Sequence, residues 1–216
     1  MIKKKAASRT HLQRAAGNGR GSRQDIKEDS PMRALLFILF FPFSFFGHDD
    51  GKELLDMALD KCERLESLED YRDILSRYGM TDKLPLACPL KEKFRISSTY
   101  GGRIHPVTKK RSFHSGIDMA VELAAPVYAT ASGTVTFAGR RGGYGRCVVI
   151  RHSYGFETLY AHLAAYYTTK GEKLVKGAVI GFAGSTGRST GYHLHYEIRK
   201  YGKTIKPYWY GYDSQR

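Results

Sequence analysis

The chain has 216 residues and a formal net charge of +14 at pH 7, with 42% hydrophobic and 26% charged residues. This length accommodates one well-buried domain with an appendage, and the hydrophobic content is ordinary for a globular protein, so disorder throughout the chain is excluded. The charge is uneven, because residues 91–216 contain 20 of the 35 Lys and Arg but only 7 of the 21 Asp and Glu, whereas residues 34–90 are acidic.

The beginning of the chain has the features of a targeting segment. Residues 1–31 are polar and basic, and we expect them to be disordered or an upstream extension of a protein that starts at Met32. Residues 34–46 form an uncharged apolar run that is shorter than a bilayer span of about 20 residues but suits the core of a signal peptide. No A-x-A-like cleavage site follows. Residues 32–48 are therefore predicted to be a signal peptide or a short anchor associated with the inner membrane, and both alternatives predict export to the periplasm, the cell envelope or the medium.

The next segment has a helical pattern. Leucines and alanines recur at helical intervals between residues 49 and 80, which predicts one acidic amphipathic helix. This helix either supports the following domain, covers its active site, or spaces it from the membrane. Residues 81–91, which contain Pro85 and Pro89, are predicted to be a linker. Cys62 and Cys88 could form a disulfide if the helix folds back, and Cys147 is expected to be a buried small hydrophobe.

Residues 92–216 have the pattern of a mainly β domain. Alternating segments at 94–100, 132–138, 146–152, 156–162 and 193–199 are separated by glycine-rich turns. Short turns between such segments favour antiparallel sheets over βαβ units. The loop GSTGRSTG at 184–191 lacks a phosphate-binding pattern and leads into a predicted strand, so it is interpreted as a turn beside the active site.

Five residues in three motifs indicate a metal site. They are His114 and Asp118 in FHSGID, His162 in LYAHL, and His193 and His195 in GYHLHYE. Two imidazoles and one carboxylate form a ligand set that suits zinc and leaves a fourth position open, as in catalytic zinc sites. In the predicted strand HLHYEI, both histidines project from one face and Leu194 and Tyr196 from the other. One ring can then bind metal while its neighbour acts on water or a carbonyl, and His162 or His193 is available as a base.

These motifs, in this order and spacing from about residue 92 to about residue 206, resemble the lysostaphin-type (LytM-like) zinc endopeptidases, which cut bacterial peptidoglycan. The resemblance implies an antiparallel β fold of the duplicated-hybrid-motif type and one zinc ion per chain. It assigns His114, Asp118 and His195 as zinc ligands, and His162 and His193 as catalytic residues. Members usually have proline before H-x-H, where this chain has Tyr192.

The resemblance implies hydrolysis of peptide cross-links or stem peptides of peptidoglycan by a metal-activated water. The catalytic histidines would orient this water, stabilise the oxyanion and pass a proton to the leaving amine. Four residues near the motifs are candidates for substrate binding: Tyr100, Arg103, His105 and Tyr192. The alternative is a non-hydrolytic module that binds the wall or activates another hydrolase while retaining zinc, and a protein substrate is a third hypothesis.

The basic charge of residues 91–216 suits either a solvated surface or an acidic wall polymer. Lys109, Lys110 and Arg111, and also Arg140 and Arg141, lie near glycine-rich turns rather than on an amphipathic helix, and no nucleic-acid-binding motif accompanies them. Nucleic acid is therefore not expected as a partner, and the sequence does not indicate an oligomeric state.

Overall fold

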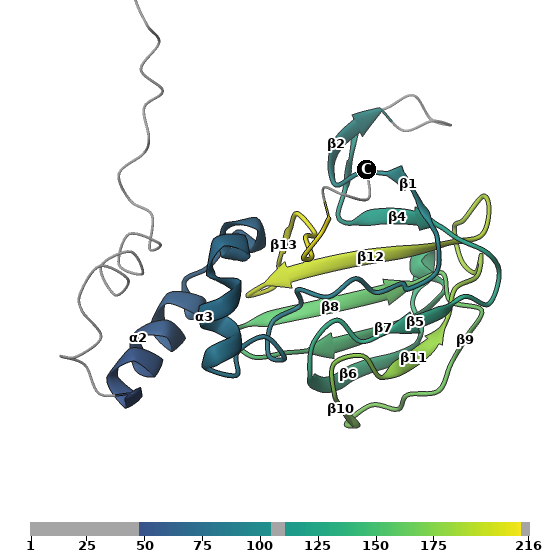
Figure 1. Cartoon of the computed structure of the whole chain (residues 1–216). Coiled ribbons are helices and arrows are strands. Elements are labelled where there is room, and N and C mark those ends of the chain that lie inside the picture. The colour runs from purple at the N-terminus through teal and green to yellow at the C-terminus, as the bar shows by residue number, and fades with distance from the viewer. Residues whose placement is uncertain (1–47, 105–110, 213–216) are drawn as a thin grey trace, which may run out of the picture. The chain divides into compact units, whose positions relative to one another are not determined.

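The computed structural model describes residues 48–104 and 111–212, with side chains from residue 51 onward. These residues are mainly β, as the sequence predicts (Figure 1). The strands are β1 (Arg95–Ser98), β2 (Gly101–Ile104), β3 (Arg111–His114), β4 (Ile117–Ala120), β5 (Pro126–Tyr128), β6 (Gly133–Arg140), β7 (Arg146–Arg151), β8 (Phe156–Ala161), β9 (Ala165–Tyr166), β10 (Lys173–Leu174), β11 (Val179–Phe182), β12 (His193–Lys200) and β13 (Lys203–Ile205).

The largest sheet has eight strands. Its path is β1-β4-β12-β8-β7-β6-β10, and β13 pairs with β12 outside that path. A three-stranded sheet has the order β5-β11-β9, and β2 and β3 form a separate two-stranded sheet. All of these pairs are antiparallel. The predicted antiparallel β fold is therefore confirmed.

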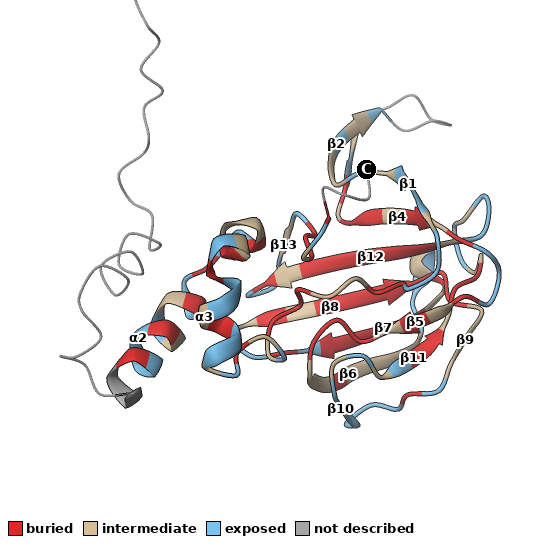
Figure 2. Ribbon diagram, in the orientation of Figure 1, coloured by how far each residue is buried: buried red, intermediate tan, exposed pale blue. Residues whose placement is uncertain are grey.

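Strand β12 lies between β4 and β8, and its side chains point alternately into the core and to the opposite face of the sheet. Leu194, Tyr196 and Ile198 are completely buried in the main hydrophobic core. His193 and His195 alternate with them and project from the opposite face, as the period of two requires. Figure 2 shows how much of β12 and β8 is buried. This predicted alternation is confirmed, and it brings two imidazoles to the same side of a rigid central strand.

The predicted helix over residues 49–80 is wrong in its continuity. The structure has α2 (His48–Asp60), a 3-10 helix η1 (Leu65–Tyr71) and α3 (Arg72–Arg77) instead. The last of these ends in a Schellman motif, because Gly79 has φ of 65° and the N–H of Met80 donates to the carbonyl of Leu75 at 2.8 Å. The apolar spacing that predicts one long helix is satisfied by separate short helices, because Leu55, Leu59, Leu65, Leu68 and Leu75 all enter one core, whereas Leu54 of α2 is exposed.

The helical segment packs at the end of β12 that is distant from His193. The Nζ of Lys200 donates to the carbonyl of Leu59 at 3.0 Å and also to the carbonyl of Tyr154. Tyr154 in turn donates its hydroxyl proton to Asp56 of α2. An eight-residue strand separates its two ends by about 23 Å. The described helices therefore support the far end of the sheet.

Residues 81–91 form no helix or strand but are packed against the domain. Leu84, Leu86 and Leu90 lie in the main core, and the carbonyl of Leu86 accepts a hydrogen bond of 3.1 Å from Tyr210. Cys62, Cys88 and Cys147 are free thiols. Within the described residues no helix has the length and apolar character needed to cross a bilayer. The apolar segment 34–46 and the polar extension 1–31 lie outside the described residues.

Candidate metal centre and catalytic histidines

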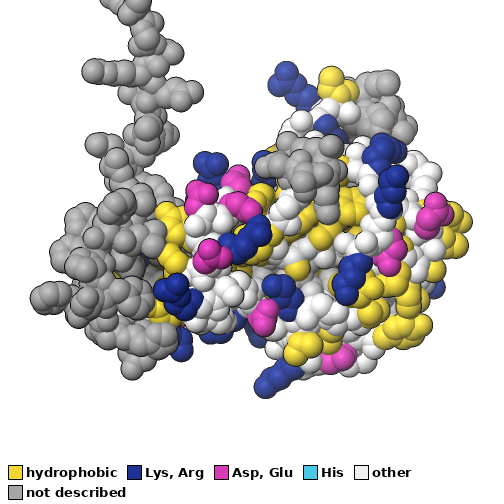
Figure 3. Space-filling view, in the orientation of Figure 1, with side chains coloured by type: hydrophobic (Ala, Val, Ile, Leu, Met, Phe, Trp, Pro, Cys, Tyr) yellow, Lys and Arg dark blue, Asp and Glu magenta, His cyan; other side chains and the backbone are white. Residues whose placement is uncertain are grey.

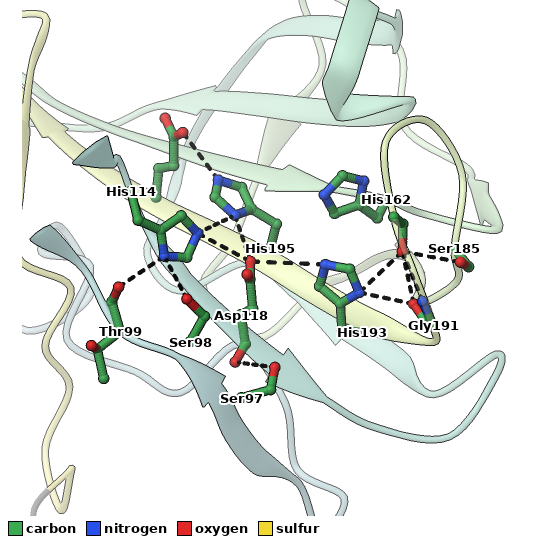
Figure 4. A network of polar contacts seen from close by, with 12 residues as sticks. Ser97, Ser98, Thr99, His114, Asp118, His162, Ser185, Gly191, His193 and His195 are labelled. Carbon is green, nitrogen blue, oxygen red and sulfur yellow. Dashed lines mark hydrogen bonds and ion pairs between the residues drawn. The ribbon is translucent and has the colours of Figure 1, made fainter. Parts of the chain in front are cut away.

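Adjacent strands bring four histidines and one aspartate together (Figure 4). His114 ends β3, Asp118 lies in β4, and His193 and His195 lie in β12. The register of β12 and β4 pairs His195 directly with Asp118. His162 follows the last residue of β8, whose Ala161 pairs with His195 on the other side. The site is thus positioned by strands β4, β12 and β8 of the central sheet together with β3 of the two-stranded sheet, although its residues are distant in the sequence.

His114, Asp118 and His195 offer ligand atoms that lie within 4.8 Å of one another. Asp118 Oδ1 is 2.8 Å from His195 Nδ1 and 3.2 Å from His114 Nε2, and these two nitrogens are 3.2 Å apart. Tetrahedral ligation at the zinc–nitrogen and zinc–oxygen distances common in proteins separates neighbouring ligand atoms by about 3.3 Å. The triangle of donor atoms therefore fits a zinc ion after shifts of a few tenths of an ångström.

The second nitrogen of each of these two imidazoles is held by an acceptor. His114 Nδ1 lies 2.8 Å from the carbonyl oxygen of Thr99, which can only accept, so Nδ1 carries the proton. His195 Nε2 lies 3.0 Å from Oε1 of Glu197. These bonds leave His114 Nε2 and His195 Nδ1 as the free nitrogens, and both face Asp118. This is the arrangement by which outer partners fix the tautomer of a metal-binding histidine.

His162 and His193 form a second pair beside this triangle. Their ring centroids are 4.6 Å apart, and His193 Nε2 lies 3.8 Å from Asp118 Oδ1. His162 Nδ1 donates to the carbonyl of Thr186 at 2.8 Å, and His193 Nδ1 donates to the carbonyl of Gly191 at 2.9 Å. In its neutral form, each ring therefore has Nε2 as the nitrogen that can accept a proton.

His162 has a left-handed backbone conformation, with φ of 61°. A non-glycine residue pays about 1 to 3 kcal/mol for such a conformation, and residues of this kind concentrate at functional sites. The surrounding backbone holds it there, because its N–H donates to the carbonyl of Tyr144 at 2.9 Å and its carbonyl accepts from Thr186 at 3.3 Å.

Burial and hydrogen bonding set the charges of the site. Burial alone would raise the pKa of Asp118, but hydrogen bonds from the protonated forms of His114 and His195 outweigh it and hold that pKa well below its usual value. Burial lowers the pKa of His162 to about 4, against the opposing effect of the Thr186 carbonyl. Asp118 is thus an anion and His162 is neutral at pH 7, which suits a ligand and a proton acceptor respectively.

Residues 112–207 match the sequence profile of peptidase family M23. The chain belongs to peptidase family M23. This match confirms the family predicted from the three motifs, and the M23 domain contains all five motif residues.

Among curated relatives, the M23 domain is similar to the DD-carboxypeptidase/endopeptidase Mpg of Neisseria meningitidis serogroup B, with 54% identity over 113 residues that cover 52% of this chain and 26% of the relative. It is also similar to the peptidoglycan DD-endopeptidase ShyA of Vibrio cholerae, with 41% identity over 118 residues that cover 54% of this chain and 27% of the relative. The chain thus spans about a quarter of the length of these relatives.

Among solved structures, a zinc-containing peptidase from Vibrio cholerae has a TM-score of 0.52 and 35% sequence identity, covering 55% of this chain and 37% of the other. This neighbour contains zinc, and the donor triangle of the present chain offers ligand types that suit the same metal.

Three of the four residues predicted to bind substrate lie in the described residues. Arg103 Nη1 is 3.8 Å from Asp118 Oδ2, and its side chain lines a cavity of about 590 Å³ at β2 and β3. Tyr192 directly precedes His193 and is 54% exposed. Tyr100 packs its ring edge against Phe113 and donates its hydroxyl to the backbone of β13. His105 lies outside the described residues.

Glu197, which the structure places against His195, is not among the site residues predicted from the sequence. The period of two in HLHYEI already places Glu197 on the face of His193 and His195, so the signal was present. Burial alone would raise the pKa of Glu197, but hydrogen bonds from His195, Ser115, Tyr144 and Arg199 lower it to about 2.

The loop at 184–191, predicted to be a turn beside the active site, also orients two histidines of the site. Its carbonyls at Thr186 and Gly191 hold the two catalytic candidates, His162 and His193. The loop is interlocked with the turn at 142–145, where a Cβ on Gly145 would lie 2.4 Å from the carbonyl carbon of Thr186, and one on Gly187 would lie 2.3 Å from the nitrogen of Gly145. Backbone hydrogen bonds join the two segments, including that from Arg188 to Gly143 at 2.9 Å.

Proposed function

We propose that the chain is a zinc endopeptidase that hydrolyses peptide bonds of bacterial peptidoglycan. In this proposal His114, Asp118 and His195 hold the zinc, and His162 and His193 are catalytic. The observation that carries it is the pairing of a zinc-sized donor triangle with two further imidazoles whose Nε2 atoms are left unprotonated. The peptidoglycan DD-endopeptidase ShyA, with 41% identity in this region, supports the class of substrate.

Zinc held by these three residues would supply a Lewis acid and would lower the pKa of a bound water to about 7. The protein residues supply the proton transfers. His162 and His193 offer no N–H to the substrate at first, because each Nδ1 proton is directed to a backbone carbonyl. Their Nε2 atoms therefore begin as acceptors, so one of them takes a proton from the attacking water and returns it to the nitrogen of the leaving amine. The opposing carbonyls of Thr186 and Gly191 keep both rings in this orientation.

Arg103 is proposed to bind a carboxylate of the wall peptide. Its guanidinium lies beside Asp118, so one cationic side chain adjoins the metal centre, and Arg111 lines the same cavity at β2 and β3. Tyr192, which is exposed and adjacent to His193, is proposed to contact the peptide backbone or an apolar side chain. The ring of Tyr100 and the side chain of His105 complete the proposed substrate-binding set.

Peptidoglycan lies in the cell envelope, so we propose that the protein acts there. Lys and Arg side chains lie at separated positions over the visible face of the domain (Figure 3), and this distribution suits attraction to an anionic polymer better than one specific polyanion site. Association with the inner membrane through residues 34–46 remains part of the proposal.

The test uses the purified full-length chain with isolated sacculi of several wall types. Released fragments are identified by mass spectrometry, with and without a chelator and with zinc added back. Cleavage of peptide bonds that the chelator abolishes and zinc restores would establish the activity and name the bond. A folded, zinc-loaded protein that cleaves none of these walls would refute hydrolysis and favour the wall-binding or activating alternative.

A further inference from the structure

Glu197 is a fully buried carboxylate whose two oxygens both have partners. Its Oε1 accepts from His195 Nε2 at 3.0 Å, from the hydroxyl of Tyr144 at 2.7 Å and from the hydroxyl of Ser115. Its Oε2 accepts from Arg199 at 2.7 Å and 3.1 Å. A buried charge is strongly unfavourable unless it is paired and hydrogen-bonded. Three side chains, those of Tyr144, Ser115 and Arg199, therefore hold one anion next to His195.

The backbone is also shaped to let these groups approach. Ser115 and Gly116 form the turn between His114 and the strand of Asp118. A Cβ on Gly116 would lie 2.3 Å from the carbonyl oxygen of Tyr196 and 2.9 Å from Cγ of Glu197. Only glycine allows this turn to press against β12 at Glu197. The turn between the proposed ligands His114 and Asp118 thus packs against the side chain of Glu197, whose carboxylate contacts the third proposed ligand.

Tyr144 extends the same network to the catalytic histidines. Its hydroxyl donates to Glu197, and its backbone carbonyl accepts from the N–H of His162, which has the left-handed conformation. Its ring also lies near His195, with ring centroids 5.7 Å apart. Glu197 therefore contacts the proposed ligand His195 directly. It is connected to the proposed ligand His114 through Ser115, and to the proposed catalytic residue His162 through Tyr144.

We propose that Glu197 is a positioning residue of the metal centre: it accepts a hydrogen bond from the Nε2–H of His195, fixes the tautomer in which Nδ1 is free, and strengthens Nδ1 as a zinc ligand. The proposal rests on the proposed function, in which His195 Nδ1 binds zinc. A carboxylate partner increases the electron density of the imidazole and prevents rotation of the ring. Arg199, Tyr144 and Ser115 hold the carboxylate so that Oε1 stays directed at His195.

The test is Glu197→Gln in the full-length chain. Glutamine preserves the size of the side chain but removes the charge, and its amide group can no longer accept from both His195 and Arg199. We expect zinc affinity, measured by competition with a chromophoric chelator, to fall about 10- to 100-fold. The visible absorption spectrum of the Co²⁺-substituted protein should also change, because the ligand field at His195 changes.

The matched control is Glu157→Gln. Glu157 is the second carboxylate that contacts Arg199, at 3.1 Å, but it makes no contact with His195. This variant should keep the zinc affinity and the Co²⁺ spectrum of the wild-type chain. Tyr144→Phe, which removes one hydrogen bond to Oε1 and leaves the charge, should weaken zinc binding at least threefold.

A zinc dissociation constant of folded Glu197→Gln within threefold of the wild-type value, with an unchanged Co²⁺ spectrum, would overturn the positioning role. If Glu197→Gln does not fold, Tyr144→Phe decides by the same threefold criterion. Failure of the wild-type chain to bind zinc would instead contradict the proposed function itself, so the two failures are distinguishable.

Discussion

The Nζ of Lys200 donates a hydrogen bond of 3.0 Å to the carbonyl of Leu59, which joins the end of β12 to the last turn of α2. The same ammonium group donates to the carbonyl of Tyr154, and the side chain is only 4% exposed. One buried cation thus satisfies acceptors on two separate segments, so the helical segment and the sheet are expected to unfold together.

We predict that Lys200→Met lowers the free energy of unfolding by about 2 kcal/mol or more, because two buried carbonyls lose their partner. Urea unfolding followed by circular dichroism measures this change. Lys203→Met, at an exposed position three residues later, is the control and should change stability by less than about 0.5 kcal/mol. Equal stability of the two variants would show that Lys200 does not couple the segments.

Two histidine variants separate metal binding from proton transfer. His195→Ala removes a proposed ligand, so zinc content and hydrolysis should both be lost. His162→Ala should retain one zinc per chain and reduce kcat about 10²- to 10⁴-fold, because a proton acceptor is removed. Elemental analysis and a sacculus digestion assay measure the two properties. A zinc-free His162→Ala protein would contradict the division of roles.

The turn at Gly116 should tolerate no side chain. Gly116→Ala places a methyl group 2.3 Å from a backbone oxygen of β12, and such overpacking costs about 1 to 3 kcal/mol. We predict a lower melting temperature and weaker zinc binding. Gly102→Ala, whose added Cβ would meet nothing within 4 Å, should leave the melting temperature within a few degrees of the wild-type value. A Gly116→Ala protein as stable as Gly102→Ala would show that the turn has room to move.

His152 should make stability depend on pH without taking part in the site. It is buried, with Nδ1 3.0 Å from the carbonyl of Ser132 and Nε2 2.7 Å from the hydroxyl of Thr158. Burial lowers its pKa to about 4 in the folded chain, from about 6.5 in the unfolded chain. The unfolded state therefore binds more protons between these pH values, and this contribution to stability is complete above about pH 6.5 and is lost as the pH falls to about 4.

The expected loss from this histidine is about 3 kcal/mol over that range. Urea unfolding of the wild-type chain and of His152→Gln at pH 7 and pH 4.5 measures it. The difference in stability between the two proteins should shrink or reverse at the lower pH. A difference that stays constant across both pH values would mean that the buried imidazole does not titrate as described.

The sequence predicted which histidines share a face of the strand, because this depends only on the alternation of neighbouring residues. The alternation of HLHYEI sets which side chains share a face, and Leu194 and Tyr196 are buried as that period requires. The antiparallel fold followed from short strands between glycine turns. Glu197 lies on the same face by the same period and could have been predicted in this way.

Other features depend on contacts that no local pattern contains. Strands β3 and β4 have four residues each, so their alternation is too short to distinguish from a loop. The orientation of His162 depends on carbonyls of Tyr144 and Thr186, which lie 18 and 24 residues away in the chain. The helix predicted over residues 49–80 is interrupted because tertiary packing of its leucines, rather than helical propensity, determines the path of that segment.

The interlocked segments 142–145 and 184–191 have a consequence for engineering the specificity of this domain. A graft that exchanges only the second segment for that of a relative would bring a new backbone against Gly145, and the carbonyl that orients His162 would move with it. Substrate preference cannot then be transplanted one loop at a time. The two segments form one exchangeable unit, and libraries should vary or transfer them as a pair.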